Sequence, residues 1–99
     1  LISGSGPGIV SYLIAAMSKE AYRRGLPEDV SEHVALRTFG GTLAHLEKTG
    51  MSLQELRDQV ATKGGVTEAI LGKLARGGFE ALFHKAIAHG LMRIKRIRT

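Results

Sequence analysis

A glycine loop that opens a predicted helix carries the strongest chemical signal in the sequence. It reads Thr62-Lys63-Gly64-Gly65-Val66-Thr67, and helical patterns lie on both sides of it. The first N–H groups of a helix have no partner inside the helix and lie at the positive end of its dipole, so such a loop can bind a carboxylate or a phosphate. A diglycine followed by a threonine is also an ordinary way to begin a helix. The pattern alone leaves both interpretations open.

The rest of the sequence predicts no second reactive centre. Ser3-Gly4-Ser5-Gly6-Pro7-Gly8 resembles a dinucleotide-binding loop only superficially, because two residues are too few for the strand that must precede such a loop. We expect a flexible entry and a helix start there. The chain has no Gly-x-Ser-x-Gly motif and no cysteine, which excludes disulfides and thiolate metal sites. The histidines, whose spacing gives no zinc motif, are His33, His45, His84 and His89.

The first element that could position the loop is a helix near the N-terminus. Pro7 suits the first turn of a helix, where its missing N–H costs nothing. Apolar residues then follow at helical spacing from Ile9 to Met17, and Gly25 ends the helix.

A second long helix is predicted to begin at Pro27 and to end at Gly50. Gly40 and Gly41 lie inside it, and each weakens helix propensity by about 1 kcal/mol relative to alanine. We therefore expect a close backbone contact with another helix at this point. This helix carries Val30, Val34, Leu43 and Leu46 among its apolar residues.

Three shorter patterns follow. Ser52 and Glu55 form a capping-box pattern for a short helix that runs to about Val60, and a further helix begins at Val66. Gly77-Gly78 interrupts the chain before a last helix with one apolar stripe. The stripe consists of Phe79, Leu82, Phe83, Ala86, Ile87, Gly90, Leu91, Ile94 and Ile97.

These patterns predict an all-α fold, a bundle of about five helices in one domain over residues 1–99. The chain has 43% hydrophobic and 23% charged residues, a composition typical of a globular protein. Two or three of the helices are long for this chain length, so part of their apolar surface would be open on a monomer. We expect a symmetric second copy to cover it.

The charge and composition of the chain indicate which partners it can bind and in which compartment we expect it. The net charge is +5, and the excess is concentrated in the last residues: Arg93, Lys95, Arg96 and Arg98. Such a cluster complements the negative end of a helix dipole or attracts nucleic acid, and the first interpretation is favoured. No apolar run approaches the roughly 20 residues of a membrane span. We expect a cytoplasmic protein without membrane contact, and, since the chain opens with Leu1, a fragment of a longer one.

The order of these motifs resembles the C-terminal dimerisation domain of pyrroline-5-carboxylate reductase over nearly the whole chain. Each motif is common, but their order and spacing together are specific. The segments are Ser3-Gly4-Ser5-Gly6-Pro7, Gly25-Leu26-Pro27, Leu56-Arg57-Asp58-Gln59-Val60, Gly64-Gly65-Val66-Thr67 and Gly77-Gly78-Phe79.

The resemblance implies one half of an oxidoreductase of proline biosynthesis. In such enzymes NADPH or NADH, bound mainly by an N-terminal Rossmann domain that this chain lacks, gives a hydride to pyrroline-5-carboxylate to form L-proline. The chain alone is expected to bind no cofactor and to be inactive. The helical half is expected to form an interlocked homodimer, and dimers can assemble further.

The resemblance also assigns roles in the loop. Thr62 matches a family serine or threonine, Gly64 and Gly65 would supply N–H groups to the substrate carboxylate, and Val66 completes the set. Thr67 matches the hydroxyl residue that faces the ring nitrogen and is our candidate catalytic residue.

Three positions depart from the family pattern Ser-Pro-Gly-Gly-Thr-Thr. Lys63 replaces a rigid proline, Val66 replaces a threonine, and Glu68 stands where an apolar residue is frequent. A related imino acid as the substrate therefore stays open, as does the choice between NADPH and NADH. Two alternative functions are a pure oligomerisation module and a small basic helical domain that binds nucleic acid.

Overall fold

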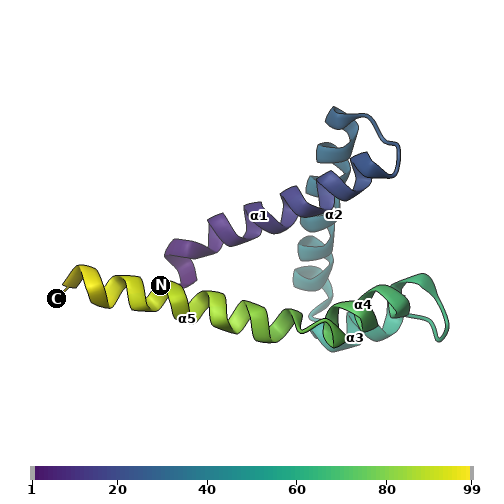
Figure 1. Ribbon diagram of the computed structural model, residues 1–99. Coiled ribbons are helices and arrows are strands. Elements are labelled where there is room, and N and C mark those ends of the chain that lie inside the picture. The colour runs from purple at the N-terminus through teal and green to yellow at the C-terminus, as the bar shows by residue number, and fades with distance from the viewer. Residues whose placement is uncertain (1, 99) are drawn as a thin grey trace. The chain divides into compact units, whose positions relative to one another are not determined.

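The computed structural model describes residues 2–98, and side chains from Gly4 to Arg93. The described residues form five helices and no strand, which confirms the predicted all-α fold (Figure 1). The helices are α1 (Ile2–Arg23), α2 (Glu28–Thr49), α3 (Leu53–Val60), α4 (Val66–Arg76) and α5 (Phe79–Arg98). The chain divides into two compact units, one ending at Leu53 and the other beginning at Gln54.

Helix α1 begins earlier than predicted. Pro7 lies inside the helix rather than in its first turn, and the glycine-rich residues around it are helical. The missing N–H of Pro7 costs the helix one bond, to the carbonyl four residues earlier, close to an end where N–H groups lack partners anyway. The prediction of a flexible entry at Ser3–Gly8 was therefore wrong for the backbone of this segment.

The turn between α1 and α2 follows the predicted glycine signal. Gly25 has φ +112, a value that favours glycine. The N–H of Gly25 donates to the Tyr22 carbonyl at 3.0 Å, and the N–H of Leu26 donates to the Ala21 carbonyl at 3.2 Å. These two bonds are the Schellman pattern that ends a helix. Pro27 then precedes the first residue of α2, as the sequence predicted.

The contact between α1 and α2 uses the small residues of α2. Ser31 and Ala35, one turn apart, are the buried residues of the described chain, and both are fully buried. The Ser31 hydroxyl donates to the Leu26 carbonyl at 3.3 Å. Val30 and Val34, which the sequence analysis named among the apolar residues of this helix, are exposed. Small side chains let two helix backbones approach closely, so they define the packed face in place of the valines.

The two glycines inside α2 face open space. A Cβ atom added to Gly40 or Gly41 would meet no heavy atom within 4 Å, apart from neighbouring helix backbone. The close contact predicted at this point is therefore not found among the described residues. At the end of α2, Gly50 has φ +69, and its N–H donates to the Leu46 carbonyl, as expected for a helix stop.

The second unit contains α4, α5 and most of α3, with ends close to those predicted from Ser52, Val60 and the diglycine of residues 77–78. No described residue of this unit is buried. In α5 the rings of Phe79 and Phe83 stack with centroids 6.2 Å apart. Over its described part the predicted stripe on α5 is exposed, except for the half-buried Ile87. The side chains of Ile94 and Ile97 lie outside the described residues, as do those of Lys95, Arg96 and Arg98.

Candidate functional site

The glycine loop leads directly into α4. Residues 61–65 form the loop, and α4 begins at Val66, as predicted. Gly64 has φ +75, a conformation that L residues rarely adopt. Gly65 is extended, with φ −87 and ψ 176, and occupies the N-cap position without a side-chain cap bond. The loop therefore turns sharply at Gly64 and delivers the chain into the helix at Gly65.

Two hydrogen bonds and one close contact fix this turn. The N–H of Gly65 donates to the Thr62 carbonyl at 2.9 Å. The N–H of Gly64 donates to the Glu68 carboxylate, at Oε1, also at 2.9 Å. A Cβ atom on Gly65 would lie 2.6 Å from the Thr62 hydroxyl oxygen and 3.0 Å from its carbonyl oxygen. Only glycine fits at position 65 while this turn is kept.

Three backbone donors at the start of α4 stay open. The first bond into the helix is from the N–H of Ala69 to the Gly65 carbonyl, at 3.2 Å. Within the described chain, the N–H groups of Val66, Thr67 and Glu68 donate no hydrogen bond. They lie in the first turn of α4, at the positive end of the helix dipole. This arrangement suits a carboxylate that approaches from solvent.

The structure differs in detail from the site that the sequence suggested. Thr62 and Val66 are exposed, and Thr67 is half-buried in the first turn of α4. The N–H groups of Gly64 and Gly65, to which the sequence assigned the carboxylate, are already bonded within the loop. The open donors therefore begin one residue further along, at Val66. Sequence reasoning missed the contact of Glu68, which it noted only as a departure from the family pattern.

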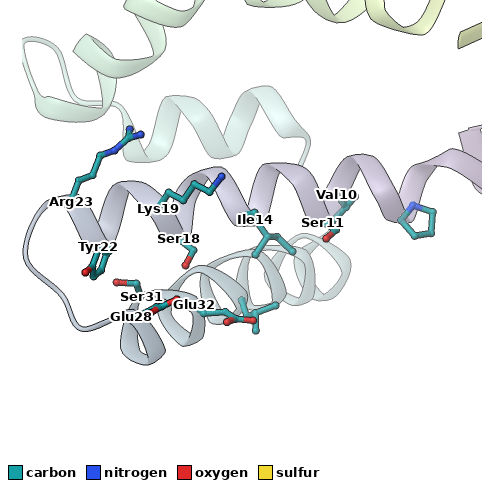
Figure 2. A pocket seen from close by; sticks show the side chains of 13 residues that line it. Val10, Ser11, Ile14, Ser18, Lys19, Tyr22, Arg23, Glu28, Ser31 and Glu32 are labelled. Carbon is teal, nitrogen blue, oxygen red and sulfur yellow. The ribbon is translucent and has the colours of Figure 1, made fainter.

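A groove lies between α1 and α2, and sequence patterns gave no sign of it. Its volume is about 1070 Å³. Ile14, Ser18 and Tyr22 lie on the side of α1 turned toward α2, and Ser31 and Glu28 lie opposite them (Figure 2). The remaining lining residues are Pro7, Val10, Ser11, Ala15, Lys19, Arg23, Glu32 and Leu36. No cluster of catalytic groups lies in it, and its mixed lining is typical of a surface that packs against protein.

One carboxyl group of α1 has a perturbed pKa. The hydrogen bond from Arg24, and then that from Arg23, hold the pKa of the Glu20 carboxyl below its usual value. The nitrogen–oxygen distances are 3.1 Å for Arg24 Nε and 3.2 Å for Arg23. All three side chains are largely exposed, and they lie in the other unit from the loop. This cluster supports the end of α1 and is not part of the candidate site.

Among the described residues, no three His, Asp or Glu side chains gather where they could hold a metal ion. None of the helices, over the residues that the structure describes, is long and apolar enough to cross a membrane.

The sequence matches one family model over almost its whole length. Residues 1–97 match the model described as pyrroline-5-carboxylate reductase dimerisation. Pyrroline-5-carboxylate reductase from Glycine max is 31% identical over 96 residues, which are 97% of this chain and 35% of that protein. Pyrroline-5-carboxylate reductase 2 from Bacillus subtilis is 37% identical over 84 residues, which are 84% of this chain and 30% of that protein.

A solved structure has the same fold. It is the crystal structure of Plasmodium falciparum pyrroline carboxylate reductase with NADP bound. The TM-score is 0.84 at 26% sequence identity, over 93% of this chain and 35% of that one. The chain thus spans about a third of the length of the relatives that it matches.

Proposed function

The chain belongs to the pyrroline-5-carboxylate reductase family, as its dimerisation domain, and we propose that it is the C-terminal half of an NAD(P)H-dependent reductase that converts 1-pyrroline-5-carboxylate to L-proline. In this proposal the dinucleotide is bound mainly by an N-terminal half, as the length of the relatives suggests. Residues 1–99 provide dimer contacts and a grip on the substrate. The three open N–H groups at the start of α4 are the observation that carries the proposal.

The substrate carboxylate is held at the first turn of α4. The N–H groups of Val66 and Thr67 are free to donate, and the helix dipole adds attraction for a negative charge. The hydroxyl of Thr62 lies against Gly65, beside the same turn, and can add a third donor. Gly64 and Gly65 shape the loop rather than donate to the substrate, since their N–H groups are bonded within it.

The chemical contribution of this half is orientation. NAD(P)H, bound to the complete enzyme, supplies the hydride that adds to the imine carbon, and the ring nitrogen keeps the proton that it already carries. An imine fixed by its carboxylate can be held within about 3–3.5 Å of a donor, which removes much of the entropic barrier. Thr67 is half-buried in the first turn of α4. We propose that its hydroxyl faces the ring nitrogen of the bound substrate and that Thr67 is the catalytic residue of this half.

The second contribution is self-association into a homodimer. Buried residues are confined to Ser31 and Ala35 within the described chain, so one copy has almost no core of its own. Large apolar side chains are exposed in both units, for example Leu43 in α2 and Leu82 in α5. A second copy that interlocks with the first would cover these faces and the groove between α1 and α2, and would supply the missing core.

The test is a kinetic comparison in the complete reductase. Loss of NAD(P)H absorbance with 1-pyrroline-5-carboxylate measures activity. The Thr67→Ala variant should lower kcat about 10- to 100-fold, the range expected when one hydrogen bond to a charged ring nitrogen is lost. Thr67→Ser keeps the hydroxyl and should retain most of the activity. If the wild-type protein reduces no cyclic imino acid, or if Thr67→Ala turns over normally, the proposal is wrong.

A further inference from the structure

The contact between Glu68 and Gly64 has no part in the function proposed above. The Glu68 carboxylate accepts the N–H of Gly64 across the mouth of the loop, at 2.9 Å. Glu68 lies in the first turn of α4, so its backbone belongs to the helix while its side chain reaches back to the loop. The bond therefore joins the glycine loop to the regular backbone of α4.

A loop with two adjacent glycines needs such a connection. Glycine loses more conformational freedom on folding than any other residue, so the segment 61–65 has many alternatives to the observed turn. Gly64 must take φ +75 for the turn to form. Among the described side chains, Glu68 is the one that binds the N–H of Gly64 in this conformation.

The bond between Glu68 and Gly64 also leaves the N–H groups at the start of α4 without an internal acceptor. The carboxylate of Glu68 takes the N–H of Gly64, and the Thr62 carbonyl takes that of Gly65. The N–H groups of Val66 and Thr67 remain free. An internal carboxylate that blocked the site would be expected on those two donors instead.

We propose that Glu68 is a positioning residue, a latch that holds the glycine loop in the conformation in which the Val66 and Thr67 N–H groups can receive the substrate carboxylate. This role rests on the proposed function, because it concerns the same site. The latch carries a negative charge near a site for a negative group. The Glu68 charge therefore weakens the electrostatic attraction for the substrate carboxylate, while the hydrogen bond of Glu68 fixes the loop.

Two substitutions separate the bond from the charge. Glu68→Ala removes both, and Glu68→Gln keeps an acceptor oxygen for the N–H of Gly64 while it removes the charge. Glu80→Ala is the matched control, since Glu80 is also an exposed first-turn glutamate that follows a diglycine. Within the described residues, the side chain of Glu80 makes no hydrogen bond or ion pair.

The test uses the complete reductase and two readouts. Steady-state kinetics with 1-pyrroline-5-carboxylate should show the KM of Glu68→Ala raised about three- to tenfold, the range expected when one exposed hydrogen bond of ordinary strength is lost, with kcat nearly unchanged. Glu68→Gln should have a KM at or below that of the wild type. Glu80→Ala should match the wild type.

Hydrogen–deuterium exchange of peptides covering residues 61–68 is the second readout, and it needs no activity. Exchange should be faster in Glu68→Ala than in the wild type, and Glu68→Gln should restore most of the protection. If the wild type does not reduce the substrate but exchange follows this order, the proposed function is wrong and the latch is not. Unchanged exchange in Glu68→Ala, or a KM of that variant at or below the wild-type value, overturns the latch.

Discussion

Gly65→Ala is the substitution whose effect on the loop can be worked out most directly. The backbone of Gly65 is extended and is open to any residue, so the cost comes only from the new methyl group. That group would lie 2.6 Å from the Thr62 hydroxyl oxygen and 3.0 Å from the Thr62 carbonyl oxygen, whereas ordinary contact begins at 3.4 Å. The hydroxyl can rotate away, but the carbonyl can retreat only by moving the backbone of the loop.

The size of the effect follows from these contacts. Overpacking of this kind costs about 1–3 kcal/mol. Replacing glycine by alanine returns roughly 0.4–1 kcal/mol through the unfolded state. The remainder, about 1–2 kcal/mol, is enough to displace the Thr62 carbonyl from the N–H of Gly65 and to misplace the donors that follow. We expect KM for 1-pyrroline-5-carboxylate to rise about tenfold.

The assay is steady-state kinetics of the complete reductase, with Gly72→Ala as the control. A Cβ atom on Gly72 would also meet a close atom, Arg76 Nη1 at 2.9 Å, but this is the end of a flexible side chain. Gly72→Ala should leave KM unchanged and raise helix stability by up to about 1 kcal/mol. A KM for Gly65→Ala within twofold of the wild type would refute the reasoning.

Three further predictions concern the rest of the chain. Gly40→Ala should raise the free energy of unfolding by up to about 1 kcal/mol, since nothing in the described chain lies near an added Cβ. Gly50→Ala should lower it by about 1 kcal/mol because Gly50 has φ +69. Urea denaturation measures both free energies, and equal shifts for the two variants would contradict this assignment. Arg24→Ala should raise the pKa of Glu20 toward its usual value in a carboxyl-carbon NMR titration, while Arg37→Ala should not. Because the folded-state pKa of Glu20 is lowered, this group stabilises the fold above the usual glutamate pKa, and the stabilisation is lost as pH falls through the lowered value. In Arg24→Ala the free energy of unfolding should therefore fall less steeply toward acid pH. The side chain of Leu82 is 68% exposed in one copy. Leu82→Arg should raise the dimer dissociation constant at least a hundredfold in sedimentation analysis, since about 1.5–3 kcal/mol of burial is lost in each copy. An intact dimer would exclude this part of α5 from the interface.

The helix ends were predictable from the sequence because they depend on local backbone rules. Gly25 and Gly50 were predicted as stops, and both take the positive φ that glycine allows. The start of α4 at Val66 follows from the preceding diglycine. Proline misled the prediction for α1, since a preference for the first turn does not forbid a position slightly further inside.

Contacts between elements were not predictable in the same way. The sequence pattern of α2 identifies apolar residues such as Val30 and Val34, but it does not say which side of the helix packs on α1. The face that packs on α1 is chosen instead by how closely two backbones approach, and this favours Ser31 and Ala35.

In the candidate site, the sequence predicted the loop and its residues, but not which N–H groups the loop itself uses. That depends on φ at Gly64 and on a side chain four residues later.

Binding of the substrate carboxylate by the first turn of α4 can be tested with the Val66→Pro variant. Proline at the first helical position is well tolerated, and Gly65 before it already has the extended conformation that proline requires, so the variant removes one open N–H without disturbing the helix. The measurement is kcat/KM of the complete reductase for 1-pyrroline-5-carboxylate and for 1-pyrroline, which lacks the carboxylate. We expect kcat/KM to fall about tenfold for the acid and hardly at all for 1-pyrroline. Equal losses for the two substrates, or no loss for either, would contradict it.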